Sequence, residues 1–356
     1  MHRTLAATAI IVAVLATPSA RGAEVTDMPP KLRGDVRIDY FGALEHGDLR
    51  EGDETFGRRH GNRHEVLYTL EFAPIDGLAV WFRVDTTLTT AVAFTDPHEM
   101  LYDPVTETGT YQGSETLPGS EDSYRRRGGG LDGLWIGVGA GPFSESWRIS
   151  HQTTWRLDVG FRTPNPNNTF WTSSGQHRGA APGGSALLLR GAWSQENEPV
   201  DAYLVGRVLY EGRVTVDVTD DDGTTIASDV TVKPATEIDV TAGMELIAGR
   251  DASRGERFAF DLFCGFGYRS YAQIPSGVLL PHVLEHSLGE PVHRSAHVLG
   301  TAGLGLVYHL NQYFGARLAG SGTYATPHRL EDVYPVRTGY DTVVVGIQAS
   351  VEGHLR

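Results

Sequence analysis

Histidine and glutamate side chains with the spacing of metal ligands are concentrated between residues 281 and 297. His282, Glu285 and His286 have the spacing at which two imidazoles on one helical face hold zinc and the glutamate serves as a base. Pro281 and Gly289 leave room for barely two helical turns, and no third ligand has a defined place. We therefore expect a solvated loop over 271–294. The alternative is binding of a divalent transition metal by His282, His286, His293 and His297.

Neighbouring serine and histidine residues are the other candidates for catalysis. Ser150 precedes His151, and Ser295 lies two residues before His297. A serine nucleophile needs a base within hydrogen-bond reach, and such neighbours arise often by chance. We therefore expect neither enzyme activity nor a bound cofactor.

Arginine and carboxylate side chains recur at alternate positions within otherwise apolar segments. Alternate residues of an extended chain share one face, so the charges line one side of each segment. If this side faces an enclosed space, the charges have two possible roles. They would either select small polar solutes in a hydrated channel or pair with one another and plug the interior. The sequence leaves both interpretations open, and we favour the channel. The predicted lining comprises Arg83, Asp85, Arg156, Asp158, Arg190, Arg207, Glu237, Asp239, Glu245, Asp261, Arg269 and Arg317.

The segments that carry these charges have the period of two that is typical of β-strands. In the segment 258–269, Phe258, Phe260 and Leu262 share one face, whereas Asp261 and Arg269 share the other. The same division recurs along the chain and predicts twelve strands. They cover 34–44, 64–72, 78–90, 131–139, 149–161, 185–195, 201–213, 235–248, 257–270, 295–308, 313–325 and 340–354.

The connections between these strands alternate strictly between short and long. The short ones are 73–77, 140–148, 196–200, 249–256 and 309–312. The long ones are 45–63, 91–130, 162–184, 214–234, 271–294 and 326–339. Barrels in bacterial outer membranes have short turns on the periplasmic side and long loops outside, so both chain ends are expected in the periplasm.

The beginning of the chain predicts export. Arg3 precedes an apolar stretch from Leu5 to Ala16 and then a run of small residues, which is the layout of a secretory signal peptide. The apolar stretch is too short to cross a bilayer as a helix. The single Cys264 excludes an intramolecular disulfide, and the net charge of −14 argues against nucleic-acid binding, which needs a basic face.

Together these features resemble the bacterial outer-membrane β-barrel class, including the porin-like proteins. The resemblance implies an all-β fold, a closed antiparallel transmembrane β-barrel of about twelve strands with short periplasmic turns and long extracellular loops. Residues 1–22 are then the signal peptide, 23–33 a periplasmic N-terminal segment and 34–356 the barrel. The chain departs from the class at its end, because Leu355 keeps the alternation where a terminal Phe or Trp is usual.

The resemblance implies a location in the cell outer membrane, with lipid and lipopolysaccharide around the barrel. The function we expect is a porin-like channel for small hydrophilic solutes through a lumen of mixed charge. The alternative is a non-conducting barrel that acts in envelope structure or binds ligands through its surface loops. The oligomeric state stays open.

Overall fold

The computed structural model describes residues 26–355 with internal gaps, and it consists almost entirely of β-strands. The described residues include no helix of the length and apolar character needed to cross a membrane. The gaps are 52–53, 96–99, 104–107, 112–123, 143–152, 165–168, 172–183, 198, 220–224, 252–255, 276–290, 312 and 332–336.

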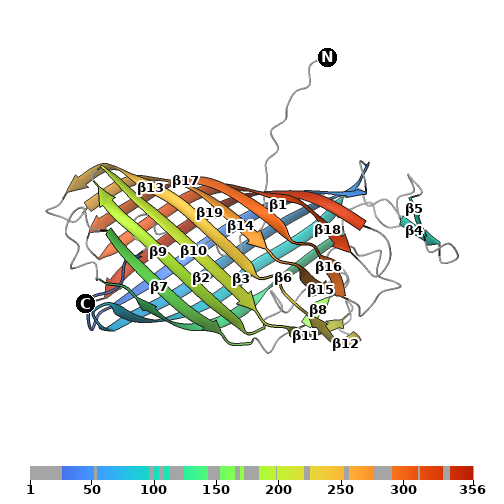
Figure 1. The fold of residues 1–356 in the computed structure, drawn as a ribbon, viewed down its shortest axis with the longest axis horizontal. Helices are drawn as coiled ribbons and strands as arrows, with labels where there is room; N and C mark the ends of the chain where they lie inside the picture. The colour runs from blue at the N-terminus through green and yellow to red at the C-terminus, as the bar shows by residue number, and fades with distance from the viewer. Residues whose placement is uncertain are drawn as a thin grey trace, which may run out of the picture.

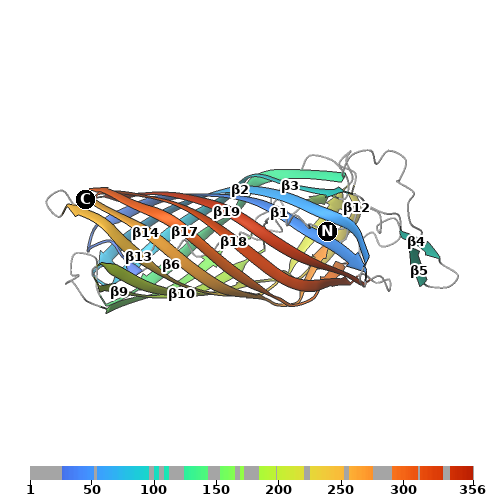
Figure 2. The ribbon, with the colours of Figure 1, turned by 90° about the horizontal axis from the view of Figure 1, so that it is seen from above.

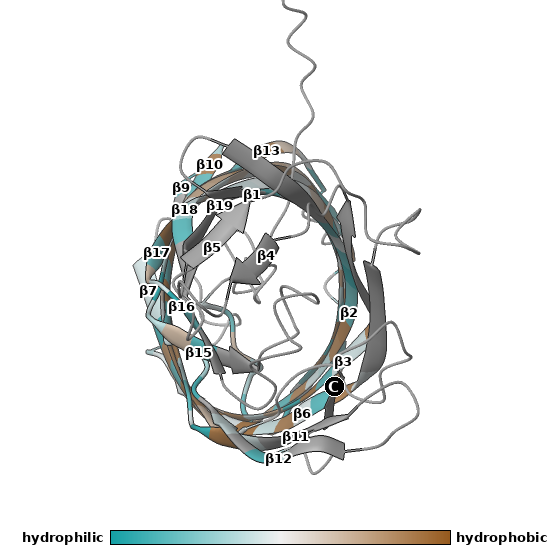
Figure 3. Ribbon diagram, turned by 90° about the vertical axis from the view of Figure 1, so that its right-hand side faces the viewer, coloured by the Kyte–Doolittle hydropathy of each residue, from teal (hydrophilic) through white to brown (hydrophobic). Residues whose placement is uncertain are grey.

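Twelve strands of the described chain form one closed antiparallel barrel, as predicted (Figures 1 and 2). Around the ring their order is β18, β17, β14, β13, β10, β9, β7, β6, β3, β2, β1 and β19, and β19 also pairs with β18. Figure 3 shows this closed ring along the barrel axis. The strands are β1 Gly34–Glu51, β2 Glu54–Ile75, β3 Leu78–Thr95, β6 Tyr124–Ala140, β7 Thr153–Arg162, β9 Ala186–Asn197, β10 Val200–Glu211, β13 Glu237–Asp251, β14 Glu256–Arg269, β17 His297–Asn311, β18 Phe314–Glu331 and β19 Arg337–Leu355.

The two faces of each strand have opposite chemistry, which is why the sheet closes around a polar interior. In β7, Trp155, Leu157 and Val159 point outward and are 46%, 52% and 44% exposed, whereas Arg156 and Asp158 point inward and are 3% exposed. Large apolar side chains cover the outer surface in the same way on the other barrel strands. An outer band of this kind needs lipid around it, and the interior holds the polar half of the alternation.

Several barrel strands are longer than the sequence indicated, and the largest extensions lie at the end where we expected long loops. The predicted loop 45–63 is largely strand, because β1 continues to Glu51 and β2 begins at Glu54. β3 continues to Thr95, and β18 to Glu331. Beyond the bilayer water contacts both faces of a strand, so neither face must be apolar and the period of two disappears from the sequence.

Shorter strands stand at this extracellular end, opposite the chain's C-terminus (Figure 1). Val214 pairs with Val232 in an antiparallel hairpin of β11 and β12, which β8 extends by a parallel pairing. β15 and β16 form a second hairpin, which joins β18, and β4 and β5 form a third. Their bounds are β4 Met100–Asp103, β5 Thr108–Tyr111, β8 Thr169–Trp171, β11 Val214–Thr219, β12 Thr225–Val232, β15 Ala272–Pro275 and β16 Pro291–Arg294.

Candidate functional site

The lumen is the candidate functional site, and all twelve predicted lining residues point into it. Each lies on the face opposite the lipid-exposed apolar residues of its strand. Their charges form ion pairs with one another and with further inward residues, among them Arg257, which the sequence analysis did not select. The structure therefore shows that the mixed-charge lining is a set of connected networks.

Arg156 is the centre of the first network, on β7. Its Nη2 lies 2.7 Å from Asp158 Oδ1, and its Nη1 lies 2.9 Å from Glu71 Oε1. Arg190 of the adjacent β9 binds the other oxygen of Asp158 at 2.7 Å. Asp158 is thus held between two guanidinium groups.

On β3, Arg83 pairs with Asp85, which also accepts a hydrogen bond from the indole Nε1 of Trp135.

The second network joins β10, β13 and β14. Arg207 Nη2 lies 2.7 Å from Glu237 Oε2 and 2.5 Å from Asp239 Oδ2. Arg269 binds the second oxygen of Asp239 at 2.7 Å. Two arginines and two carboxylates therefore neutralise one another along the wall, as buried charges must.

The third network surrounds Asp261, whose side chain is fully buried. Arg317 donates to Asp261 Oδ2 from Nε and Nη2, at 3.1 and 2.5 Å, and Tyr203 Oη donates to Oδ1 at 2.8 Å. Arg257 contacts both Glu245 and Asp201, at 2.5 and 2.6 Å. Of these predicted lining residues, Glu245 has its partner on the adjacent strand, and Asp261 has its partners two strands away on either side.

Sequence reasoning missed several of these inward charges. Arg162 pairs with Glu211 at 2.7 Å, and Arg257 pairs with Asp201. The signal was available, because Arg162 has the same parity along β7 as Arg156, and Arg257 has the same parity along β14 as Asp261. Their positions near strand ends hid them.

Inward aromatic side chains lie against glycines of the neighbouring strands. Trp81, Gly137 and Gly160 are successive cross-strand partners, and a Cβ added to either glycine would lie 2.2–2.3 Å from the Trp81 ring. A second row runs through Tyr203, Gly243, Phe263 and Gly303, with a Cβ on Gly303 only 2.2 Å from Phe263 Cζ. Glycine thus leaves the space that lets each ring lie along the wall.

The residues that precede β1 enter the periplasmic mouth of the lumen. Thr26 is buried, and its Oγ1 lies 2.5 Å from Thr154 Oγ1 and 2.8 Å from Ser194 Oγ, both on inward faces. Arg156 Nη1 donates to the carbonyl of Asp27 at 2.5 Å. The backbone N–H of Leu32 donates to the carbonyl of Ala73, and the N–H of Ala73 donates to the carbonyl of Arg33, where the chain crosses the rim into β1. Residues 26–28 therefore narrow this mouth.

The predicted histidine cluster is only partly within the described residues, since His282 and His286 fall in the gap 276–290. His293 lies on β16 beside Tyr271, with ring centroids 5.2 Å apart. His297 is buried at the start of β17 and stacks on His328 with centroids 4.1 Å apart. His328 is an inward histidine of β18, and the sequence analysis did not select it.

The ion pairs named above run along the wall of the lumen. Arg190 and Asp158 lie on adjacent strands, as do Arg207 and Glu237. The widest separation is that of Arg156 on β7 and Glu71 on β2, which are three places apart in the ring of twelve. None of these pairs joins opposite walls.

The solved structures that are similar to this chain share about a tenth of its sequence. No protein-family model and no curated protein match the sequence. An outer membrane channel from Pseudomonas putida F1 is 10% identical, with a TM-score of 0.45, over 91% of this chain and 96% of that chain. A Pseudomonas aeruginosa FadL homologue is 9% identical, with a TM-score of 0.41, over 91% and 90%. The NanC porin is 9% identical, with a TM-score of 0.34, over 86% and 98%.

Proposed function

We propose that this barrel is a narrow channel of the outer membrane for small hydrophilic solutes. The observation that carries the proposal is the wall-bound arrangement of the lumen side chains. The arginines of the three networks bind carboxylates on the same or nearby strands, and the aromatic rings lie over glycines. A barrel plugged by its own side chains would instead place these groups across the axis.

The chemistry of the lining supports a hydrated interior. Full desolvation costs several kcal/mol per ion even with partners, so water beside the more exposed members of the lining, Arg83, Asp85 and Arg190, would lower their energy. Within the described part of the chain, buried Asp132 Oδ1, Thr69 Oγ1 and Thr342 Oγ1 have no protein hydrogen-bond partner. Water would satisfy these atoms. Because both signs of charge are present along the wall, we expect discrimination by size and polarity more than by ionic sign.

Conductance in planar bilayers tests the proposal. The purified folded protein should produce discrete single-channel steps, and vesicles that contain it should swell in small sugars or amino acids. Absence of steps across a wide range of salt concentrations and voltages would refute the channel.

A pair of cysteine variants tests whether solute passes through the lumen itself. Ser321 and Gly322 are consecutive in β18, and the alternation places Ser321 inside and Gly322 on the lipid face. In a Cys264→Ser background, a bulky water-soluble thiol reagent should reduce the conductance of Ser321→Cys. Gly322→Cys should keep its conductance, since its thiol faces lipid. Equal responses would place the conducting path elsewhere.

One observation favours a second candidate, a non-conducting barrel of the envelope. Thr26 and Met28 are buried within the periplasmic mouth, where they occupy part of its cross-section. If the full chain conducts no ions and a variant with glycine at 26–28 also conducts none, the non-conducting barrel is the better assignment.

The location and processing of the chain form part of the same proposal. Residues 1–22 serve as a signal peptide that is removed on export, and lipid and lipopolysaccharide surround the outer band. The mass of the protein extracted from outer membranes would show the cleavage. A mass that still includes residues 1–22 would contradict it.

A further inference from the structure

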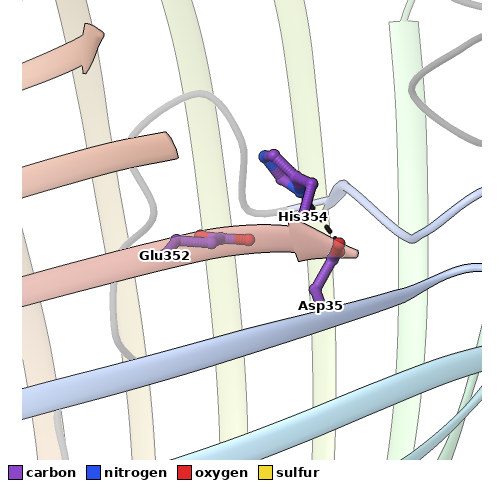
Figure 4. A group of neighbouring side chains, drawn as sticks. All are labelled: Asp35, Glu352 and His354. Atoms are coloured by element: carbon purple, nitrogen blue, oxygen red, sulfur yellow. Dashed lines mark hydrogen bonds and ion pairs between the residues drawn. The ribbon is translucent and has the colours of Figure 1, made fainter. Parts of the chain in front are cut away.

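Three side chains with metal-binding chemistry meet at the periplasmic end of the seam between the first and last barrel strands (Figure 4). Asp35 of β1 and His354 of β19 are direct cross-strand partners, and Glu352 precedes His354 by two residues. All three point inward, because Val36 and Val351 occupy the lipid face of the same strands. The register of the seam therefore brings one imidazole and two carboxylates together.

The distances are close to those of a coordination sphere. His354 Nδ1 lies 2.8 Å from Asp35 Oδ1, and one ligand atom from each of the three residues lies within 4.8 Å of the other two. Metal–ligand bonds of about 2.0–2.2 Å place neighbouring ligand atoms of a tetrahedral zinc site roughly 3.3–3.6 Å apart. Small rotations of the side chains would reach this geometry, and the strand register would stay unchanged.

The surroundings also suit a cation. Arg37 is the cross-strand partner of Glu352. Its Nε, however, donates to Asp39 Oδ2 at 2.8 Å, farther along β1 from Asp35. A second imidazole, that of His309 on β17, lies over Gly315 of β18. Gly315 pairs with His309 on one side and with Glu352 of β19 on the other. A Cβ on Gly315 would lie 3.1 Å from His309 Nδ1, so the glycine leaves room for this ring.

We propose that Asp35, Glu352 and His354 bind a divalent transition metal, with zinc as the matching probe. Imidazole and carboxylate ligands suit this class of ion. The metal would join two strands whose ligands are 319 residues apart in the chain, where the barrel closes. The unfolded chain has no such preformed site, so binding would stabilise the closed barrel. The site is separate from His293 and His297, which lie at the extracellular end.

Calorimetric titration of the folded, chelator-treated protein with zinc chloride tests the proposal. Wild type should bind one zinc ion at this site. His354→Gln, Asp35→Asn and Glu352→Gln should each weaken binding by at least about 10-fold, since removing residues that only hydrogen-bond a metal ligand already has effects of about 10–100-fold. His328→Gln is the matched control, because His328 is also an inward histidine, at the opposite end of the barrel. It should leave the zinc affinity at the seam unchanged.

The thermal unfolding midpoint provides a second measurement. Zinc should raise the midpoint of wild type and of His328→Gln and leave that of His354→Gln unchanged. If His354→Gln does not fold, Glu352→Gln gives the same comparison, since Glu352 lies three residues before Leu355, the last paired residue of β19. Equal zinc affinity in wild type and the seam variants would overturn the proposal. So would loss of binding in His328→Gln with full binding in His354→Gln.

Discussion

Replacing Arg156 with methionine should destabilise the barrel more than the same change at Arg190, although both arginines bind Asp158. The Arg156 side chain is 4% exposed and contacts Asp158, Glu71 and the carbonyl of Asp27. The Arg190 side chain is 14% exposed and binds Asp158 Oδ2 through Nη1. Methionine keeps most of the apolar stem, so the comparison isolates the guanidinium.

The expected loss of folding free energy depends on which charges each variant leaves without a partner. Breaking a buried ion pair costs about 3–5 kcal/mol, because a charge is left without its partner. In Arg156→Met, Asp158 keeps Arg190, so we expect the low end, about 3 kcal/mol. In Arg190→Met, Asp158 keeps both bonds from Arg156, and we expect about 1 kcal/mol, the size of one net hydrogen bond. The difference of about 2 kcal/mol corresponds to roughly a 30-fold difference in the unfolding equilibrium constant.

Urea unfolding of the barrel in lipid vesicles, followed by tryptophan fluorescence, measures both values. Glu71→Gln combined with Arg156→Met should be less destabilising than the sum of the single changes, with a coupling of about 1–3 kcal/mol. Equal destabilisation by Arg156→Met and Arg190→Met would refute the reasoning. Strict additivity with Glu71→Gln would do the same, since it would mean that this buried pair contributes no interaction energy.

Three further predictions concern the mouth, the wall and the outer band. Replacing residues 26–28 with glycine should increase single-channel conductance, since their side chains narrow the periplasmic mouth; an unchanged value would contradict the obstruction. Gly137→Ala should destabilise the barrel by about 1–3 kcal/mol in urea, because its methyl group would overlap Trp81. Gly206→Ala, with nothing within 4 Å of its Cβ, is the control and should unfold like wild type. Leu304→Arg, on the lipid face, should cost about 2–4 kcal/mol in the same assay, and a neutral effect would argue against burial in the bilayer.

The barrel itself was predictable because the membrane imposes a local rule on each strand. Lipid contacts one face and the polar lumen the other, so alternate residues such as Leu157 and Asp158 must differ in polarity. The rule fails outside the bilayer, where both faces of a strand contact water. The extensions of β1 and β2 into the predicted loop 45–63 were therefore invisible in the sequence.

The sequence by itself determined that charges face the lumen, but only the tertiary structure decided which of them pair. The inward placement of Asp261 or Arg207 depends on parity within a single strand, which the chain carries locally. The pairing of Arg317 with Asp261 depends on the stagger of β14, β17 and β18, which arises only when the sheet twists and closes.

The same distinction applies to the seam and the mouth. Asp35 and His354 are 319 residues apart, and they meet because the closing register pairs the first strand with the last. The burial of Thr26 against Ser194 likewise requires the finished interior. Local alternation determined the barrel and the polarity of its interior, whereas closure created the ion-pair networks, the narrowed mouth and the proposed metal site.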